Sequence, residues 1–162
     1  MNFFKEYKKL DPSADSFGKC SNTSNGVRAS GGYGDLKDLY SKYKFVIAME
    51  SKQKPYYVTE KILNAFEAGS IPIYWGDSIY AKELFNQKAF IDASKFSSMK
   101  ELAEYIYKIK SDPKKLLSIG SEPVFKDNIV PEIFKWRTKN TSNIMEAADY
   151  LRIVFFNRVK FK

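Results

Sequence analysis

One stretch decides the fold: residues 44–76, with the sequence KFVIAMESKQKPYYVTEKILNAFEAGSIPIYWG. Its two continuous apolar runs, 45–49 and 71–75, have strand length and the composition of strands that are covered on both faces. Between them, Thr59 stands where a helix N-cap belongs, and residues 60–68 have a helical apolar spacing. A strand, a helix and a strand within about thirty residues form a βαβ unit, so we expect two parallel strands.

The same alternation continues outward from this unit. A capping box, Ser98-Met99-Lys100-Glu101, opens a longer helix, and Asp112-Pro113 caps and starts another that ends near Gly120. A glycine-bearing polar stretch from 18 to 34 is mostly loop, with room for one short strand near 16–18. Further elements are predicted as helices at 3–10, 35–43 and 80–85 and a strand at 89–91, giving one α/β domain with a small parallel sheet.

Composition narrows the chemistry. The chain has 162 residues, of which 44% are apolar, and this size and composition predict one globular domain. It contains no histidine and a single cysteine, Cys20, so Ser-His-Asp and Cys-His catalysis, histidine-ligated zinc and an internal disulfide are all excluded. A single cysteine is compatible with a reducing cellular compartment, and the first residues lack the layout of a signal peptide. We therefore expect a cytoplasmic protein.

The net charge of +8 suggests an anionic partner: nucleic acid, anionic lipid or a phosphorylated small molecule. Nucleic-acid binding rests only on this charge and on 16% aromatic residues, without a recognisable motif, and we do not expect it. The glycines at 31, 32 and 34 form neither a dinucleotide fingerprint nor a phosphate loop. Residues 143–162 are predicted to form a basic amphipathic helix, which either packs on the core or touches a membrane.

A ligand site is best placed at the segment 50–61, because open parallel sheets bind ligands beyond the carboxyl ends of their strands. This segment leaves a strand and enters a helix N-terminus, which favours an anion. Lys61 supplies positive charge, Glu50 and Glu60 supply acceptors for hydroxyl groups, and tyrosines at 56 and 57 supply flat faces. The alternative is a solvated Lys–Glu pair with two tyrosines that only pack.

Three segments carry a family resemblance: YKFVIAMES at 43–51, YVTEKI at 57–62 and AGSIPIYWG at 68–76. Together they resemble the signature of the α-1,3/4-fucosyltransferases, glycosyltransferase family 10. The similarity extends over about residues 15–137, from a short motif at 17–20 to a weak match at 134–137. The resemblance implies a Rossmann-like open parallel sheet with flanking helices, the C-terminal half of a two-domain GT-B enzyme, lacking its first strand.

The resemblance also implies a function and a site. The domain, residues 1–142, would bind GDP-fucose for inverting transfer of fucose to a glycan hydroxyl, with an α-1,3 linkage. The residues that match donor-binding positions are Glu50, Tyr57, Thr59, Glu60 and Lys61. Lys61 would neutralise the diphosphate, Glu60 would accept a hydrogen bond from a sugar hydroxyl, and Tyr57 would line the pocket. No divalent metal and no other cofactor are expected.

Two departures from the family pattern matter. The family's F-E-N stretch reads Met49-Glu50-Ser51 here, so a hydroxyl replaces an amide. The acceptor domain, which is expected to supply the catalytic base, has no counterpart in the chain, so no catalytic residue is assigned and we expect no activity from the chain alone. The alternative function is a non-catalytic module that docks to a separate chain or, through its basic tail, to an anionic membrane surface.

Overall fold

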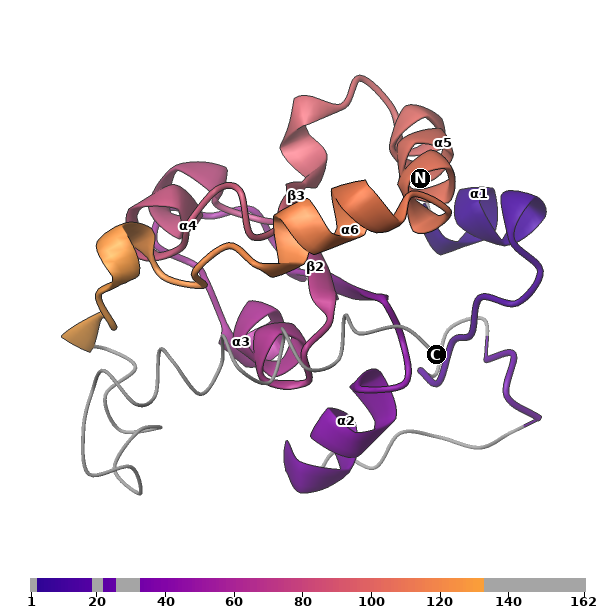
Figure 1. Ribbon diagram of the computed structural model, residues 1–162, viewed down its shortest axis with the longest axis horizontal. Helices are drawn as coiled ribbons and strands as arrows, with labels where there is room; N and C mark the ends of the chain where they lie inside the picture. Colours follow the sequence, from indigo (N-terminus) through magenta and orange to yellow (C-terminus); the bar gives the residue numbers. More distant parts are fainter. Residues whose placement is uncertain (1–2, 19–21, 26–32, 133–162) are drawn as a thin grey trace.

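A computed structural model describes residues 3–18, 22–25 and 33–132 of the chain (Figure 1). Its sheet contains strands β1 (Phe45–Met49), β2 (Ile71–Trp75) and β3 (Ile91–Asp92), which are parallel and lie in the order β1-β2-β3. Helix α3 (Glu60–Glu67) connects the first two strands. The predicted βαβ unit is therefore confirmed, and β1 forms one edge of the described sheet.

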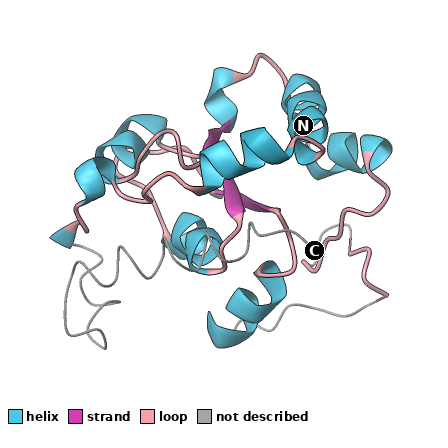
Figure 2. Ribbon diagram, viewed as in Figure 1, coloured by secondary structure: helices cyan, strands magenta, loops and turns pink. Residues whose placement is uncertain are grey.

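Helices cover both faces of the sheet (Figures 1 and 2). Helices α1 (Phe3–Leu10), α5 (Met99–Lys110) and α6 (Pro113–Gly120) pack on one face, around Ile71 and Ile73. Helices α3 and α4 (Ser78–Leu84) pack on the other face, around Ala48 and Tyr74, and α2 (Tyr33–Tyr40) lies against α3. Short 3-10 turns occupy Ala93–Lys95 and Lys126–Asn128.

The predicted helix ends are mostly confirmed. Gly69 follows α3 with a positive φ of 74°, the left-handed conformation that terminates a helix at low cost for glycine. The hydroxyl of Ser98 accepts from the backbone N–H of Glu101 at 3.1 Å, and the carboxylate of Asp112 caps α6. The predicted capping box is only half right, because the Glu101 carboxylate accepts from the backbone and hydroxyl of Ser97.

Three predicted boundaries are wrong. Helix α2 ends at Tyr40, not at residue 43, because the chain tightens into turns there and the Ser70 hydroxyl contacts the carbonyl oxygens of Tyr40 and Tyr43, at 2.8 Å each. The strand expected at 89–91 is displaced to Ile91–Asp92. Helix α4 begins two residues early, because Asp77 accepts from the backbone N–H groups of residues 79 and 80.

Two further expectations need correction. Ile47, in the middle of β1, is 43% exposed, so this strand is not covered on both faces in the described structure. The stretch near residues 16–18, which had room for a short strand, is loop, with a bend at Gly18. The predicted helix at 143–162, the domain boundary at 142 and Cys20 lie outside the described residues. Within the described part of the chain, no helix is long and apolar enough to cross a bilayer.

Candidate ligand site at the carboxyl ends of the strands

An acidic residue follows or ends each strand at the same edge of the sheet. Glu50 comes directly after β1, Asp77 comes two residues after β2, and Asp92 ends β3. Because parallel strands share one carboxyl edge, these three side chains belong to one face of the domain. We call this face the carboxyl edge.

Glu50 is the centre of the carboxyl edge. Its side chain is fully buried, and its carboxylate accepts three kinds of hydrogen bond: from the backbone N–H of Thr59 at 2.8 Å, from the Thr59 hydroxyl at 2.9 Å and from the Lys61 ammonium at 2.7 Å. A buried carboxylate requires such compensation, because burial without partners strongly disfavours its charge. Glu50 therefore fixes both the entry into α3 and the position of Lys61.

This arrangement changes the role predicted for Thr59. Thr59 does occupy the N-cap position of α3, but its hydroxyl bonds to Glu50 and does not cap the helix. The first backbone N–H groups of a helix have no partner within the helix and carry partial positive charge. The side chain of Lys61 stays 36% exposed beside them. A helix N-terminus and a half-exposed cation therefore lie together at this edge.

Gly76 allows the backbone after β2 to come close to Glu50. A Cβ at this position would lie 2.8 Å from Cγ of Glu50 and 2.9 Å from Cζ of Tyr74, closer than van der Waals contact allows. Tyr74 is fully buried, and burial, followed by the charges of Glu50, Asp77 and Asp92, raises the pKa of its phenol. Only glycine fits between these two side chains.

Asp77 ties the loop after β1 to the start of α4. One of its carboxylate oxygens caps α4, and the other accepts from the backbone N–H of Tyr56 at 2.7 Å. Tyr56 has a positive φ of 61°, which is strained for a residue with a Cβ, and its ring meets that of Tyr80 edge to face at 5.2 Å. The loop 51–58 is thus held at its far end by a side chain that the sequence argument did not identify.

Asp92 closes the edge at β3. Its carboxylate accepts from the backbone N–H and hydroxyl of Ser94 and from the hydroxyl of Ser78, and Lys82 lies 3.1 Å from its second oxygen. Burial acts to raise the pKa of Asp92, but the hydrogen bonds from Ser94 and Lys82 outweigh it and the pKa falls. These contacts join α4 to β3 and stabilise the carboxyl edge.

The structure brings together only part of the predicted set. Carboxylate Glu50 contacts both Thr59 and Lys61, whereas the hydroxyl of Tyr57 pairs with that of Ser51, a residue outside the set, at 3.5 Å. Glu60 is exposed and contacts none of them. Gly76 and Asp77 were missed, although a glycine directly after a strand and an aspartate before a helix are recognisable signals.

The chemistry of this edge is that of an anion site. Lys61 and the N-terminus of α3 present donors and positive charge, and exposed Lys52 and Lys54 add charge in the adjoining loop. In the described residues, no three acidic or cysteine side chains gather in a way that could hold a metal ion. The expectation of a metal-free site stays a prediction.

The fold is an open parallel α/β sheet, and sheets of this class place their ligand sites beyond the carboxyl ends of the strands, where this chain has a cation and a helix N-terminus. A family model described as glycosyltransferase family 10 (fucosyltransferase) C-term matches residues 1–119. The chain therefore belongs to glycosyltransferase family 10, as the motif resemblance indicated.

Curated relatives agree with this assignment. The chain is 36% identical over 132 residues to a putative fucosyltransferase of Acanthamoeba polyphaga mimivirus, a match that covers 77% of the chain and 21% of that protein. It is 37% identical over 113 residues to an alpha-(1,4)-fucosyltransferase of Arabidopsis thaliana, covering 60% of the chain and 28% of the relative. The matched region thus spans less than a third of the length of each of these relatives.

Solved structures confirm the fold. The crystal structure of an alpha1,3-fucosyltransferase with GDP-fucose superposes with a TM-score of 0.66 at 23% sequence identity. The match covers 99% of this chain and 43% of that one, as expected for one half of a GT-B enzyme. The Rossmann-like open parallel sheet with flanking helices is therefore the fold of this chain.

Proposed function

We propose that this chain supplies the GDP-fucose-binding part of a fucosyltransferase, which transfers fucose with inversion to a glycan hydroxyl in an α-1,3 linkage. One observation carries the proposal: the ammonium of Lys61, positioned at 2.7 Å by buried Glu50, stands half-exposed at the uncapped N-terminus of α3. Family membership supports the choice of donor, because the similar crystal structures include one with GDP-fucose.

In this proposal Lys61 meets the diphosphate of the donor. Its bond to Glu50 uses one of three ammonium hydrogens, which leaves two that can donate to phosphate oxygens. Negative charge grows on the diphosphate as GDP departs, so a fixed cation stabilises the transition state more than the ground state. Glu50 is then a positioning residue, because it acts through Lys61 and is itself buried.

The remaining matched residues would bind the rest of the donor. Glu60 lies on the exposed first turn of α3, where its carboxylate can accept from a sugar hydroxyl. The ring of Tyr57 is 36% exposed in the adjoining loop and can line the pocket. We further propose that Lys61 and the N-terminus of α3 replace the divalent cation that many diphosphate sites use, so GDP should bind equally well with EDTA or Mg²⁺.

Transfer also requires a base that removes the proton of the acceptor hydroxyl. The three buried or half-buried carboxylates of the carboxyl edge are Glu50, Asp77 and Asp92, and each already accepts hydrogen bonds that hold the fold. None of the three is available to an acceptor. We therefore propose that the base comes from polypeptide outside the described residues, and that the chain alone binds donor without transferring fucose.

Calorimetric titration with GDP tests the proposal on three proteins. The wild-type chain should bind GDP, Lys61→Ala should weaken binding at least tenfold, and Lys108→Ala, which removes an exposed lysine of α5, should bind within twofold of wild type. Lys61→Arg keeps the cation beside Glu50 and should retain most of the affinity. Absence of binding by a folded wild-type chain at millimolar GDP would refute the proposal.

A further inference from the structure

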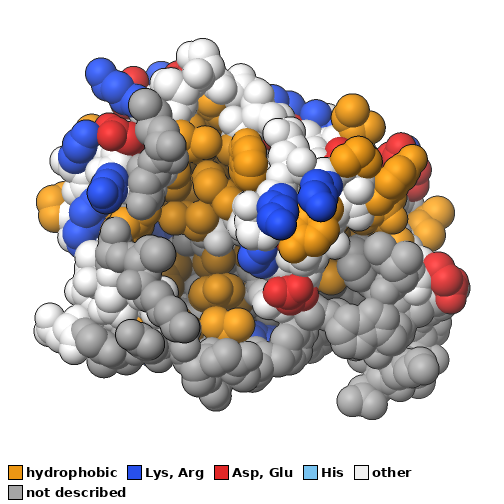
Figure 3. All heavy atoms as spheres, turned by 180° about the vertical axis from the view of Figure 1, so that it is seen from behind, with side chains coloured by type: hydrophobic (Ala, Val, Ile, Leu, Met, Phe, Trp, Pro, Cys, Tyr) orange, Lys and Arg blue, Asp and Glu red, His pale blue; other side chains and the backbone are white. Residues whose placement is uncertain are grey.

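Two apolar side chains stand out at the carboxyl edge. Tyr56 and Ile79 are each 77% exposed, more than any other large apolar side chain in the described part of the chain. Their backbone N–H groups donate to the same carboxylate, that of Asp77, at 2.7 and 3.1 Å. Figure 3 shows apolar side chains that protrude at the surface in the region of α4. Neither residue has a part in the donor site proposed around Lys61.

The backbone at Tyr56 does not favour a tyrosine. The N–H of Tyr57 donates to the carbonyl of Lys54 at 3.1 Å and closes a four-residue turn with Pro55 in its second position. Tyr56 takes the third position with a φ of 61°, a conformation for which such turns prefer glycine or asparagine. The turn therefore carries a strained residue whose ring is largely exposed, and residues strained in this way cluster at ligand sites.

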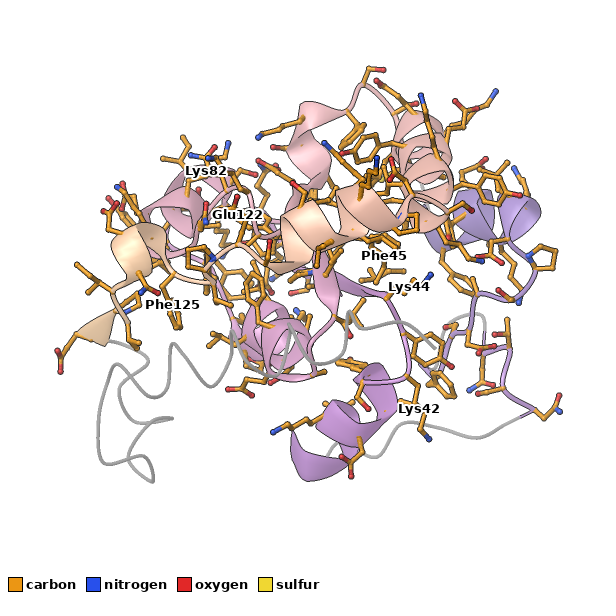
Figure 4. The ribbon with its side chains drawn as sticks, viewed as in Figure 1. Lys42, Lys44, Phe45, Lys82, Glu122 and Phe125 are labelled. Atoms are coloured by element: carbon orange, nitrogen blue, oxygen red, sulfur yellow. The ribbon has the colours of Figure 1, made fainter. Side chains whose placement is uncertain are left out.

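A rigid neighbour supports the exposed ring of Tyr56. Tyr80, on α4, meets this ring edge to face at 5.2 Å and is itself packed against the core. Helix α4 is fixed in turn, because Asp77 caps it and Lys82, labelled in Figure 4, pairs with Asp92 of β3 at 3.1 Å. Tyr56 therefore offers a supported aromatic ring that most of its surface exposes to water.

The chemistry of this surface fits a sugar ring. A pyranose has a face of C–H bonds, which carry partial positive charge and pack on the electron-rich face of an aromatic ring. A ligand on a ring that is 77% exposed keeps most of its own polar groups in water. This environment suits a polyhydroxylated sugar and not a nucleobase, whose site must enclose the flat ring.

We propose that Tyr56 and Ile79 form a platform on which one sugar ring of the acceptor glycan packs. We call this pair the Tyr56 platform. The inference rests on the proposed function, because transfer of fucose requires an acceptor hydroxyl close to the donor. Tyr56 lies in the loop that leads to Lys61, and Asp77 holds this loop at the carboxyl edge, so the platform and the donor site adjoin.

Saturation-transfer NMR tests the Tyr56 platform with a simple sugar. The probe is methyl β-D-glucopyranoside, whose axial C–H bonds at three alternate ring carbons share one face, and the control is glucitol, which has similar hydroxyl groups but no ring. The wild-type chain should transfer saturation to the probe, most strongly to these axial hydrogens, and at most about a third as much to glucitol. Absence of transfer to the probe at about 50 mM, or equal transfer to glucitol, would overturn the proposal.

Variants locate the sugar on the platform. Tyr56→Gly suits the backbone of the turn, so it should keep Tm within about 2 °C of wild type while it lowers the transfer at least about threefold. Ile79→Ser should lower the transfer about twofold. Tyr56→Phe keeps the ring and should retain the transfer, as should Tyr107→Ala, which removes an exposed ring from α5. Equal transfer to wild type and to either Tyr56→Gly or Ile79→Ser would overturn the proposal.

Addition of GDP separates this inference from the donor site. Saturating GDP should leave the transfer to the probe in place, because the two ligands occupy adjoining positions. Loss of the transfer on addition of GDP would show that the nucleotide covers the platform and would overturn the acceptor role. If calorimetry detects no binding of GDP, the proposed donor site fails, whereas transfer that depends on Tyr56 would still support a sugar platform.

Discussion

Replacing Glu50 with glutamine removes the charge from the centre of the carboxyl edge while preserving the shape of the side chain. Its amide oxygen can still accept from Thr59, but no acceptor then faces the Lys61 ammonium, 2.7 Å away in the wild type. A hydrogen bond between charged groups contributes about 1.5–3 kcal/mol. Because the Lys61 side chain is 36% exposed and can recover water, we expect a loss near the lower end, about 1.5–2 kcal/mol.

Thermal unfolding followed by circular dichroism measures this loss. For a chain of this size, 1 kcal/mol lowers Tm by about 2–4 °C, so Glu50→Gln should unfold about 3–8 °C below wild type. The control variant Glu60→Gln removes the same charge from an exposed position at the start of α3 and should change Tm by less than about 2 °C. Equal Tm values for wild type and Glu50→Gln would show that this carboxylate does not organise the edge.

Other sites give equally direct tests. Gly76→Ala should lower the free energy of unfolding by about 1–3 kcal/mol in urea titrations, because the added Cβ crowds Tyr74; an unchanged midpoint would contradict the close approach. Asp77→Ala removes the cap of α4 and should cost about 1–2 kcal/mol by the same assay. Burial opposes the charge of Asp11, but hydrogen bonds from Lys110 and from Ser13 lower its pKa to about 2. The ionised carboxylate therefore stabilises the folded chain fully above the ordinary aspartate pKa of about 4, and this contribution is lost as the pH falls toward 2. Lys110→Met should therefore unfold at a higher pH in an acid titration than wild type, and identical acid midpoints would refute this linkage.

Local sequence patterns predicted most of the fold because the deciding signals are local. Apolar runs of strand length flank residues 60–68, and the cap at Asp112 and the stop at Gly69 lie within one turn of the helices they bound. Of the boundaries that failed, the start of α4 follows a local cap at Asp77 that was overlooked, whereas the end of α2 depends on a distant partner. The end of α2 is set by the Ser70 hydroxyl, thirty positions further along the chain, and periodicity carries no information about such a contact.

The candidate site was likewise predictable from the sequence only in part. Strand order alone placed Glu50 and Lys61 at one edge, but the hydroxyl of Thr59 turned out to bond to the carboxylate and not to cap the helix. Residue propensities do not distinguish these two roles, because the same hydroxyl can serve either. The exposure of Ile47 was also unpredictable, because an apolar run does not reveal whether the next strand is present.

Chemical-shift mapping with GDP tests the central claim most directly, because it locates the ligand as well as detecting it. Amide signals of the uniformly ¹⁵N-labelled chain would be followed during titration with GDP. We expect the largest shifts on residues 50–61 and on Gly76 and Asp77, at the carboxyl edge, and we expect Lys61→Ala to abolish them. Shifts concentrated on α1, α5 and α6, away from this edge, or no shifts at millimolar GDP, would contradict a donor site at the carboxyl edge.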